Sequence, residues 1–142
     1  MNQKEEEILL KQKALGILFL GIVIAALAGC SSESASSLPD YNKITAKEAK
    51  EMMDHNTDIV ILDVRTEEEF NTGHIEGALL IPDNEIAEKA EATLTDKSAT
   101  ILVYCRSGRR SVLSAKELIE LGYSKVYDFG GIIDWEYDIV TE

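Results

Sequence analysis

The chain has 142 residues and a formal net charge of −12 at pH 7. A molecule this acidic is repelled by nucleic acid and by anionic lipid surfaces, which excludes both as partners bound through charge. Any small anion that it binds must be attracted by a local concentration of positive side chains.

The N-terminal part has the pattern of an export signal. Residues 14–28 form an uncharged apolar run, shorter than the roughly 20 residues that a membrane-spanning helix needs, so they fit the core of a secretory signal peptide. Its end, Leu27-Ala28-Gly29-Cys30, resembles the lipobox of bacterial lipoproteins. That resemblance implies cleavage before Cys30 and a lipid on its sulfur. An uncleaved signal anchor is the alternative.

These features predict three segments: a lipoprotein signal peptide over 1–29, a serine-rich tether over 30–40 and one domain over 41–142. Two lysines, Lys11 and Lys13, precede the apolar run and favour a cytoplasmic location for that end. We therefore expect an extracytoplasmic domain, anchored to a bacterial membrane through the lipid on Cys30.

Short apolar runs alternate with helical patterns from Tyr41 onward. Two capping-box signatures, Thr45 with Glu48 and Thr66 with Glu69, each predict the start of a helix. In chain order the patterns predict a helix over 45–54, a strand over 59–62, a helix over 66–73, an apolar run over 78–81, a helix over 84–92, a strand over 100–104, a helix over 111–121, a strand over 125–127 and a helical turn over 132–136.

Continuous apolar strands that alternate with helices are typical of an α/β fold with a mostly parallel sheet and helices on both faces. Ligands of such sheets bind beyond the carboxyl ends of the strands. The strand over 100–104 leads directly into residues 105–111, which read C-R-S-G-R-R-S. We therefore expect the functional site in this segment.

Cys105 is the predicted nucleophile of that segment. It lies between a buried strand and a helix start, where amide groups and the helix dipole favour an anion, and three arginines follow within five residues. These features favour the thiolate, the nucleophilic form of cysteine. Gly108 permits a tight loop whose amides can hold a small oxyanion. The alternative is an inert buried thiol.

The chain has two cysteines. If Cys30 carries a lipid, Cys105 is the one free thiol of an exported protein, which marks it as reactive. One thiol with His55 and His74 does not make a zinc site, and we expect neither a metal nor a separate cofactor.

Three motifs, in order, resemble the rhodanese family. Residues 105–111 resemble the active-site loop of single-domain rhodaneses, of pattern C-x-x-G-x-x-S/T. Residues 62–70, 73–78 and 81–82 resemble the first signature of the family, and Phe129-Gly130-Gly131 with Trp135 resembles its C-terminal signature. The match extends over about residues 41–137.

The resemblance implies a rhodanese-like fold and sulfurtransferase activity. The Cys105 thiolate would attack the outer sulfur of thiosulfate or a similar small anionic donor, leaving a covalent persulfide. A thiol, cyanide or a protein acceptor would then take that sulfur. The cradle for the donor would come from Arg106, Ser107, Gly108, Arg109 and Arg110.

Four further residues, Asp63, Arg65, His74 and Trp135, match signature positions that we interpret as structural. Asp63 and Arg65 are expected to form an ion pair at the strand end and Trp135 to pack, while a hydrogen-bonded turn role is favoured for His74 over catalysis. Residues 67–69 are all glutamate, so an arginine that binds thiosulfate in two-domain relatives is not expected there. The proline often seen after the tryptophan is also missing.

Two other functions remain open. A cysteine phosphatase or arsenate reductase also uses a thiolate loop, but tyrosine phosphatases place an arginine six positions after the cysteine, where this chain has Ser111. The shorter spacing, with Arg110, favours attack on a small sulfur atom. A membrane-tethered persulfide carrier or interaction module would share Cys105 but turn over free thiosulfate poorly.

Overall fold

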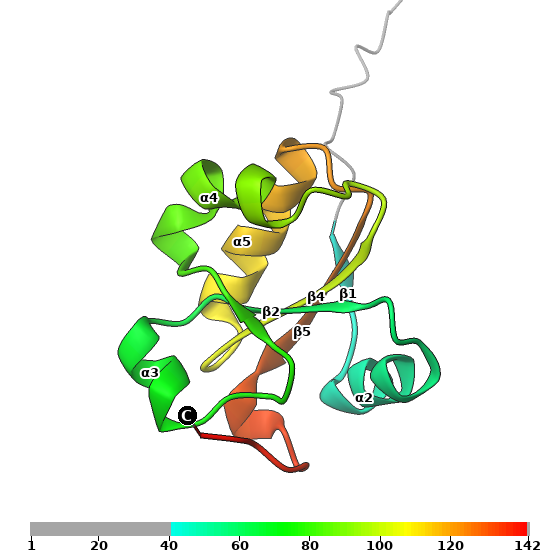
Figure 1. Ribbon diagram of the computed structural model, residues 1–142. Coiled ribbons are helices and arrows are strands. Elements are labelled where there is room, and N and C mark those ends of the chain that lie inside the picture. The colour runs from blue at the N-terminus through cyan, green and yellow to red at the C-terminus, as the bar shows by residue number, and fades with distance from the viewer. Residues whose placement is uncertain (1–40, 142) are drawn as a thin grey trace, which may run out of the picture. The chain divides into compact units, whose positions relative to one another are not determined.

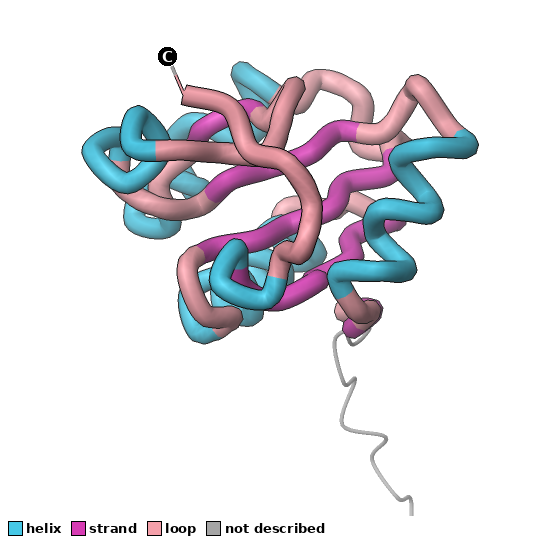
Figure 2. Tube along the Cα trace, turned by 90° about the horizontal axis from the view of Figure 1, so that it is seen from below, coloured by secondary structure: helices cyan, strands magenta, loops and turns pink. Residues whose placement is uncertain are grey.

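The computed structural model describes residues 41–141, so the predicted signal peptide, the tether and Cys30 lie outside the described residues. Five parallel strands form one sheet in the order β1-β5-β4-β2-β3 (Figures 1 and 2). They are β1 (Asn42–Lys43), β2 (Val60–Asp63), β3 (Leu79–Leu80), β4 (Thr100–Cys105) and β5 (Lys125–Gly131). The helices are α2 (Ala46–His55), α3 (Glu67–Thr72), α4 (Ile86–Thr93) and α5 (Arg109–Glu120), with 3-10 turns η1 (Asp83–Glu85) and η2 (Ile132–Asp134).

The central strand β4 is buried on both faces of the sheet. Its residues Ile101, Val103 and Cys105 belong to the core beneath α4 and α5. The alternate residues Leu102 and Tyr104 belong to a second core beneath α2, which lies on the other side of the sheet in Figure 1. A strand covered on both faces must be apolar throughout, so this arrangement confirms the predicted α/β fold with helices on both faces.

The elements follow the predicted order, with differences at their ends. Both predicted capping boxes are present, Thr45 with Glu48 and Thr66 with Glu69. Helix α5 starts two residues earlier than predicted, because Gly108 adopts a φ of 93° and serves as its N-cap. Strand β5 continues past the predicted end at residue 127, and the two-residue strand β1 was not predicted. Pairing along β5 creates β1, which has too few residues to show a pattern.

Between residues 41 and 141, no helix is both long and apolar enough to cross a membrane. In the same part of the chain, no three His, Cys, Asp or Glu side chains gather where one metal ion could bind.

Candidate active site

Cys105 is the last residue of β4 and pairs with Gly131 of β5, after an irregularity that shifts the register of the two strands between Val103 and Cys105. Its position at the carboxyl end of the central strand places the thiol at the edge where parallel sheets bind ligands. Only 1% of the residue is exposed to solvent. The sequence predicted this location for the site, at the passage from a buried strand to a helix.

Hydrogen bonds from the following loop surround the sulfur. The backbone N–H of Gly108 donates to Cys105 Sγ at 3.1 Å. Sγ also lies 3.6 Å from Ser111 Oγ. The protonated thiol donates to this hydroxyl, whereas an ionised sulfur accepts from it. The positive φ of Gly108 turns the chain back so that its amide points at the sulfur.

The pKa of Cys105 results from two opposing effects. Burial raises the pKa of the thiol, but hydrogen bonds from the backbone and hydroxyl of Ser111 and from the backbones of Ser107 and Gly108 lower it by more. The net result is a pKa below the ordinary value, which favours the nucleophilic thiolate. The sequence predicted this direction partly from the three arginines, whereas the structure assigns it to amide and hydroxyl donors.

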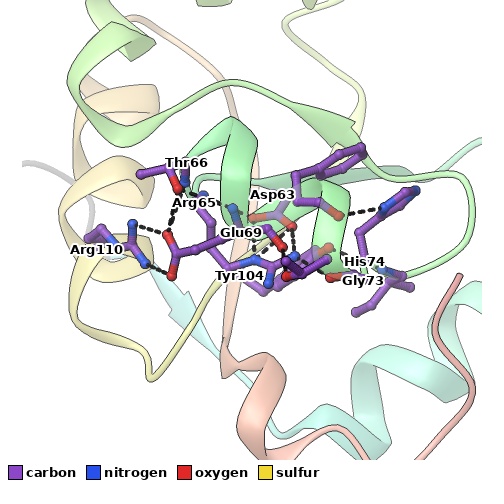
Figure 3. A network of polar contacts seen from close by, with 11 residues as sticks. Asp63, Arg65, Thr66, Glu69, Gly73, His74, Tyr104 and Arg110 are labelled. Atoms are coloured by element: carbon purple, nitrogen blue, oxygen red, sulfur yellow. Dashed lines mark hydrogen bonds and ion pairs between the residues drawn. The ribbon is translucent and has the colours of Figure 1, made fainter. Parts of the chain in front are cut away.

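The three arginines of the loop differ in their surroundings. Arg106 and Arg109 are exposed, whereas Arg110 is partly buried. Two nitrogens of the Arg110 guanidinium, Nη1 and Nη2, each donate to a carboxylate oxygen of Glu69 at 2.8 Å (Figure 3). The same carboxylate accepts hydrogen bonds from the backbone N–H and the hydroxyl of Thr66. The positive charge of Arg110 is therefore already offset within the protein.

This ion pair shifts the pKa values of both partners. The hydrogen bond with Arg110 lowers the pKa of Glu69 to about 2, with a further contribution from Thr66. The hydrogen bond with Glu69 raises the pKa of Arg110, and the negative charge of Cys105 adds to the rise. Arg110 thus lies within electrostatic reach of the reactive sulfur.

The loop rests directly on the end of β5. A Cβ atom added at Gly131 would lie 2.4 Å from the carbonyl oxygen of Arg106 and 2.6 Å from Ser107 Cα. The backbone N–H of Ile133 in η2 also donates to that carbonyl, at 3.3 Å. Glycine at position 131 therefore allows the two backbones to touch. This close contact explains why the signature has a glycine here.

The expected ion pair between Asp63 and Arg65 is present and buried. Both carboxylate oxygens of Asp63 accept from the Arg65 side chain, at 2.6 to 3.0 Å. Arg65 Nη2 also donates to the carbonyl of Gly73 at 2.8 Å. Nearby, the hydroxyl of Tyr104 accepts from the N–H of Ile75, and burial together with Asp63 raises the pKa of that hydroxyl well above its ordinary value. These contacts, some drawn in Figure 3, fix the end of β2 to the turn after α3.

His74 and Trp135 both pack against other aromatic rings. His74 is buried, its Nδ1 lies 3.0 Å from the carbonyl of Phe70, and its ring stacks on Phe70 with centroids 3.7 Å apart. This matches a hydrogen-bonded turn residue. Trp135 packs between Phe129 and Tyr137, with ring centroids 5.8 and 4.9 Å away.

Three contributors to the site were not assigned from the sequence: Ser111 beside the sulfur, Glu69 on Arg110, and Gly131 beneath the loop. Ser111 and Gly131 belong to the motifs described above, so the sequence marked both positions. It did not indicate which contacts they make. Glu69 was read only as part of an acidic, helix-capping stretch, and nothing in the local pattern links it to an arginine 41 positions away.

The fold and the loop together define a parallel α/β domain whose central strand ends in a cysteine of lowered pKa at the start of a helix. Comparison with protein families shows that the model of the rhodanese-like domain matches residues 45–138. The chain belongs to the rhodanese-like domain family, as the sequence motifs indicated.

Similar proteins agree with this assignment. The thiosulfate sulfurtransferase PspE of Escherichia coli K12 is 38% identical over 73 residues, which cover 51% of this chain and 70% of that protein. The putative sulfur carrier protein YrkF of Bacillus subtilis is 36% identical over 106 residues, covering 74% of this chain and 55% of that protein. The chain thus spans about half of the length of YrkF. A structure described as a rhodanese with anions from E. coli is 34% identical, covers 59% of this chain and 99% of its own, and has a TM-score of 0.56.

Family membership and these relatives identify the chain as a sulfurtransferase of the rhodanese type. The fold, the family and this class of enzyme are therefore confirmed.

Proposed function

We propose that the domain transfers sulfane sulfur through a persulfide on Cys105, with thiosulfate or a similar anionic compound as donor and a thiol or cyanide as acceptor. The observation that carries this proposal is the hydrogen bond from Gly108 N–H to Sγ at 3.1 Å, joined by the contact with Ser111. Donors aimed at a sulfur stabilise a thiolate, and after transfer they can stabilise the charge of a persulfide.

The reaction has two displacements. The Cys105 thiolate forms a bond to the outer sulfur of thiosulfate, the S–S bond of thiosulfate breaks, and sulfite leaves with the electron pair. The acceptor, for example cyanide, then attacks the outer sulfur of the persulfide. The S–S bond to Cys105 breaks, thiocyanate leaves, and the thiolate is regenerated. The two displacements balance without an oxidant, and the hydrogen bonds that lower the pKa of Cys105 favour the thiolate that attacks.

The surroundings of Cys105 suit an anionic donor. Arg106 and Arg109, one and four residues after Cys105, are exposed in a chain whose net charge is −12. Their charge, together with the amides at the start of α5, provides the local attraction that a small anion needs. The comparison with a rhodanese described as holding anions, and with PspE, which is named a thiosulfate sulfurtransferase, supports this choice.

Mass spectrometry tests the proposal directly. After incubation with thiosulfate, we expect the intact protein to gain one sulfur atom, about 32 Da, and to lose it to cyanide as thiocyanate. Cys105→Ser should show neither change. A wild-type protein that gains no sulfur from thiosulfate, an organic thiosulfonate or a low-molecular-weight persulfide would contradict the persulfide mechanism. Hydrolysis of an aryl phosphate that depends on Cys105 would support the phosphatase alternative instead.

A second candidate is a persulfide carrier that serves a protein acceptor. It is favoured by the similarity to YrkF, which is named a putative sulfur carrier. A carrier should load Cys105 fully in a single turnover but show slow steady-state production of thiocyanate. Rapid steady-state turnover would favour the enzyme with small-molecule substrates.

The lipid anchor is a separate proposal, supported by the apolar run over 14–28 and by Leu27-Ala28-Gly29-Cys30. In a bacterial host, the full chain should partition with membranes, and the N-terminal peptide of the mature protein should carry a diacylglyceryl group on Cys30. Cys30→Ala should abolish the lipid. A full-length protein that keeps residues 1–29 in the membrane would show a signal anchor.

A further inference from the structure

A bidentate ion pair connects α3 to the first turn of α5. Glu69 and Arg110 are joined by two hydrogen bonds of 2.8 Å, and their side chains are 28% and 17% exposed. Glu69 is held on its other side by the capping box with Thr66 (Figure 3). The carboxylate is therefore fixed from two directions, and it fixes the guanidinium in turn.

Arg110 lies near enough to Cys105 for the charges of the two groups to interact. It directly precedes Ser111, which contacts Sγ. The anionic groups whose charge acts on its guanidinium are Glu69 from α3, the sulfur of Cys105 from β4, and Asp83 from η1. Of these, Glu69 alone forms hydrogen bonds with Arg110 among the described residues.

We infer that Glu69 determines donor specificity by masking the charge of Arg110, so that the loop discriminates less strongly in favour of doubly charged donors. This inference rests on the proposed function. A bare guanidinium at this position would attract a dianion such as thiosulfate more than a monoanion, because Coulomb attraction scales with the charge of the ligand. With Glu69 in place, the pair is electrically neutral and attraction depends on Arg106, Arg109 and the loop amides.

The variant Glu69→Gln removes the mask with little structural change, because glutamine at the third helical position also completes a capping box. We expect its KM for thiosulfate to fall by roughly three- to tenfold, as for a partly exposed charge, with a smaller change in kcat. The KM for an aryl thiosulfonate, which carries one negative charge, should fall less. Both differences should shrink as salt is raised, since salt screens exposed charges.

Two controls isolate the effect. Glu68→Gln makes the same change of charge on the exposed side of the same helix, and we expect its KM for either donor to match the wild type. The double variant Arg110→Gln/Glu69→Gln should have a KM for thiosulfate close to the wild type, because it removes both charges of a neutral pair and exposes neither. Thermal melts would verify that each variant is folded.

The same variants can be tested without sulfur transfer. The rate of Cys105 alkylation by iodoacetamide, measured against pH, reports the fraction of thiolate. Unmasking Arg110 should move this profile to lower pH in Glu69→Gln but not in Glu68→Gln.

The outcomes separate this inference from the proposed function. A KM for thiosulfate that is unchanged or higher in Glu69→Gln, with a wild type that turns over, would overturn charge masking and leave the persulfide mechanism intact. A wild type that gains no sulfur would overturn the proposed function. In that case, an alkylation profile identical in Glu69→Gln and wild type would also refute the masking of Arg110.

Discussion

The thiol of Cys105 is more than 90% buried, yet its pKa lies below the ordinary value. Burial by itself makes a cysteine inert, as it would in the alternative of a structural thiol. The donors supplied by Ser107, Gly108 and Ser111 reverse that effect. At the scale of single residues, the reactivity of this sulfur depends on a few hydrogen bonds more than on arginine charge.

Removal of one of those donors should therefore lower the rate at which the Cys105 thiol reacts. In Ser111→Ala the hydroxyl near Sγ is lost, and with it part of the stabilisation of the thiolate. We expect the pKa of Cys105 to rise and alkylation by iodoacetamide at pH 7 to be about three- to tenfold slower, the size expected for one hydrogen bond.

Ser114→Ala provides the matched control. Ser114 is buried on the same helix, and its hydroxyl has no hydrogen-bond partner within residues 41–141. Its replacement should leave the alkylation profile of Cys105 unchanged. Equal behaviour of the two variants would show that the Ser111 hydroxyl does not act on the sulfur.

At the scale of elements, the site is a junction of β4, α5 and β5. The loop after β4 reaches its position because Gly131 of β5 has no side chain in its path. The contact is backbone against backbone, so no rotamer change can relieve an added atom. The geometry of the sulfur cradle thus depends on a residue of another strand.

Gly131→Ala should consequently damage both stability and reactivity. Because the added Cβ would meet the loop backbone at Arg106 and Ser107, we expect a loss of about 1–3 kcal/mol in the free energy of unfolding, typical of overpacking. Alkylation of Cys105 should slow as the loop moves. Gly77→Ala is the contrast: its φ of 76° strains alanine, but apart from the two chain neighbours no atom of the described part of the chain lies within 4 Å of the added Cβ. It should reduce stability and leave the thiol unaffected.

The ion pair between Glu69 of α3 and Arg110 of α5 should make a contribution to stability that is lost in acid. The folded pKa of Glu69, about 2, is below its ordinary value of 4.5, so its stabilising effect is complete above the ordinary value and is lost as pH falls toward 2. The Tm advantage of wild type over Glu69→Gln should be present near pH 5 and shrink near pH 2. An advantage independent of pH would contradict this assignment.

Sequence patterns were sufficient to locate the elements that are long or that begin with a capping box. The strand at 100–104 and the two capping boxes are local features, and each has its predicted location. Strand ends were less predictable, because β1 and the extension of β5 form only through pairing with neighbours. Likewise, the early start of α5 depends on the left-handed conformation of Gly108.

At the scale of the whole molecule, the buried pair of Asp63 and Arg65 joins β2 to the turn that follows α3. Asp63 is 0% and Arg65 is 5% exposed, and the guanidinium also holds the carbonyl of Gly73. The sequence suggested the pair because both residues match positions of the family signature at a strand end. The link to Gly73 could not be read from the sequence, since it depends on how α3 folds back.

Loss of one partner should destabilise the entire domain. Arg65→Met leaves the carboxylate of Asp63 buried without its counter-charge, and we expect a decrease of about 3–5 kcal/mol in the free energy of unfolding, measured with urea. Lys47→Met breaks a pair with Glu51 whose side chains are 79% and 62% exposed, and it should change stability little. Similar losses in the two variants would contradict a dominant role for the buried pair.

The burial of Cys105 has a consequence for how the domain meets an acceptor. With 1% of the residue exposed, the chain's own sulfur offers almost no surface to a large partner. In the proposed persulfide, the added atom extends about 2 Å beyond Sγ, the length of an S–S bond. If that atom lies on the solvent side of the loop, a loaded domain exposes a sulfur that an empty domain lacks. A protein acceptor that contacts this atom would then bind the loaded domain more tightly and dissociate after the transfer.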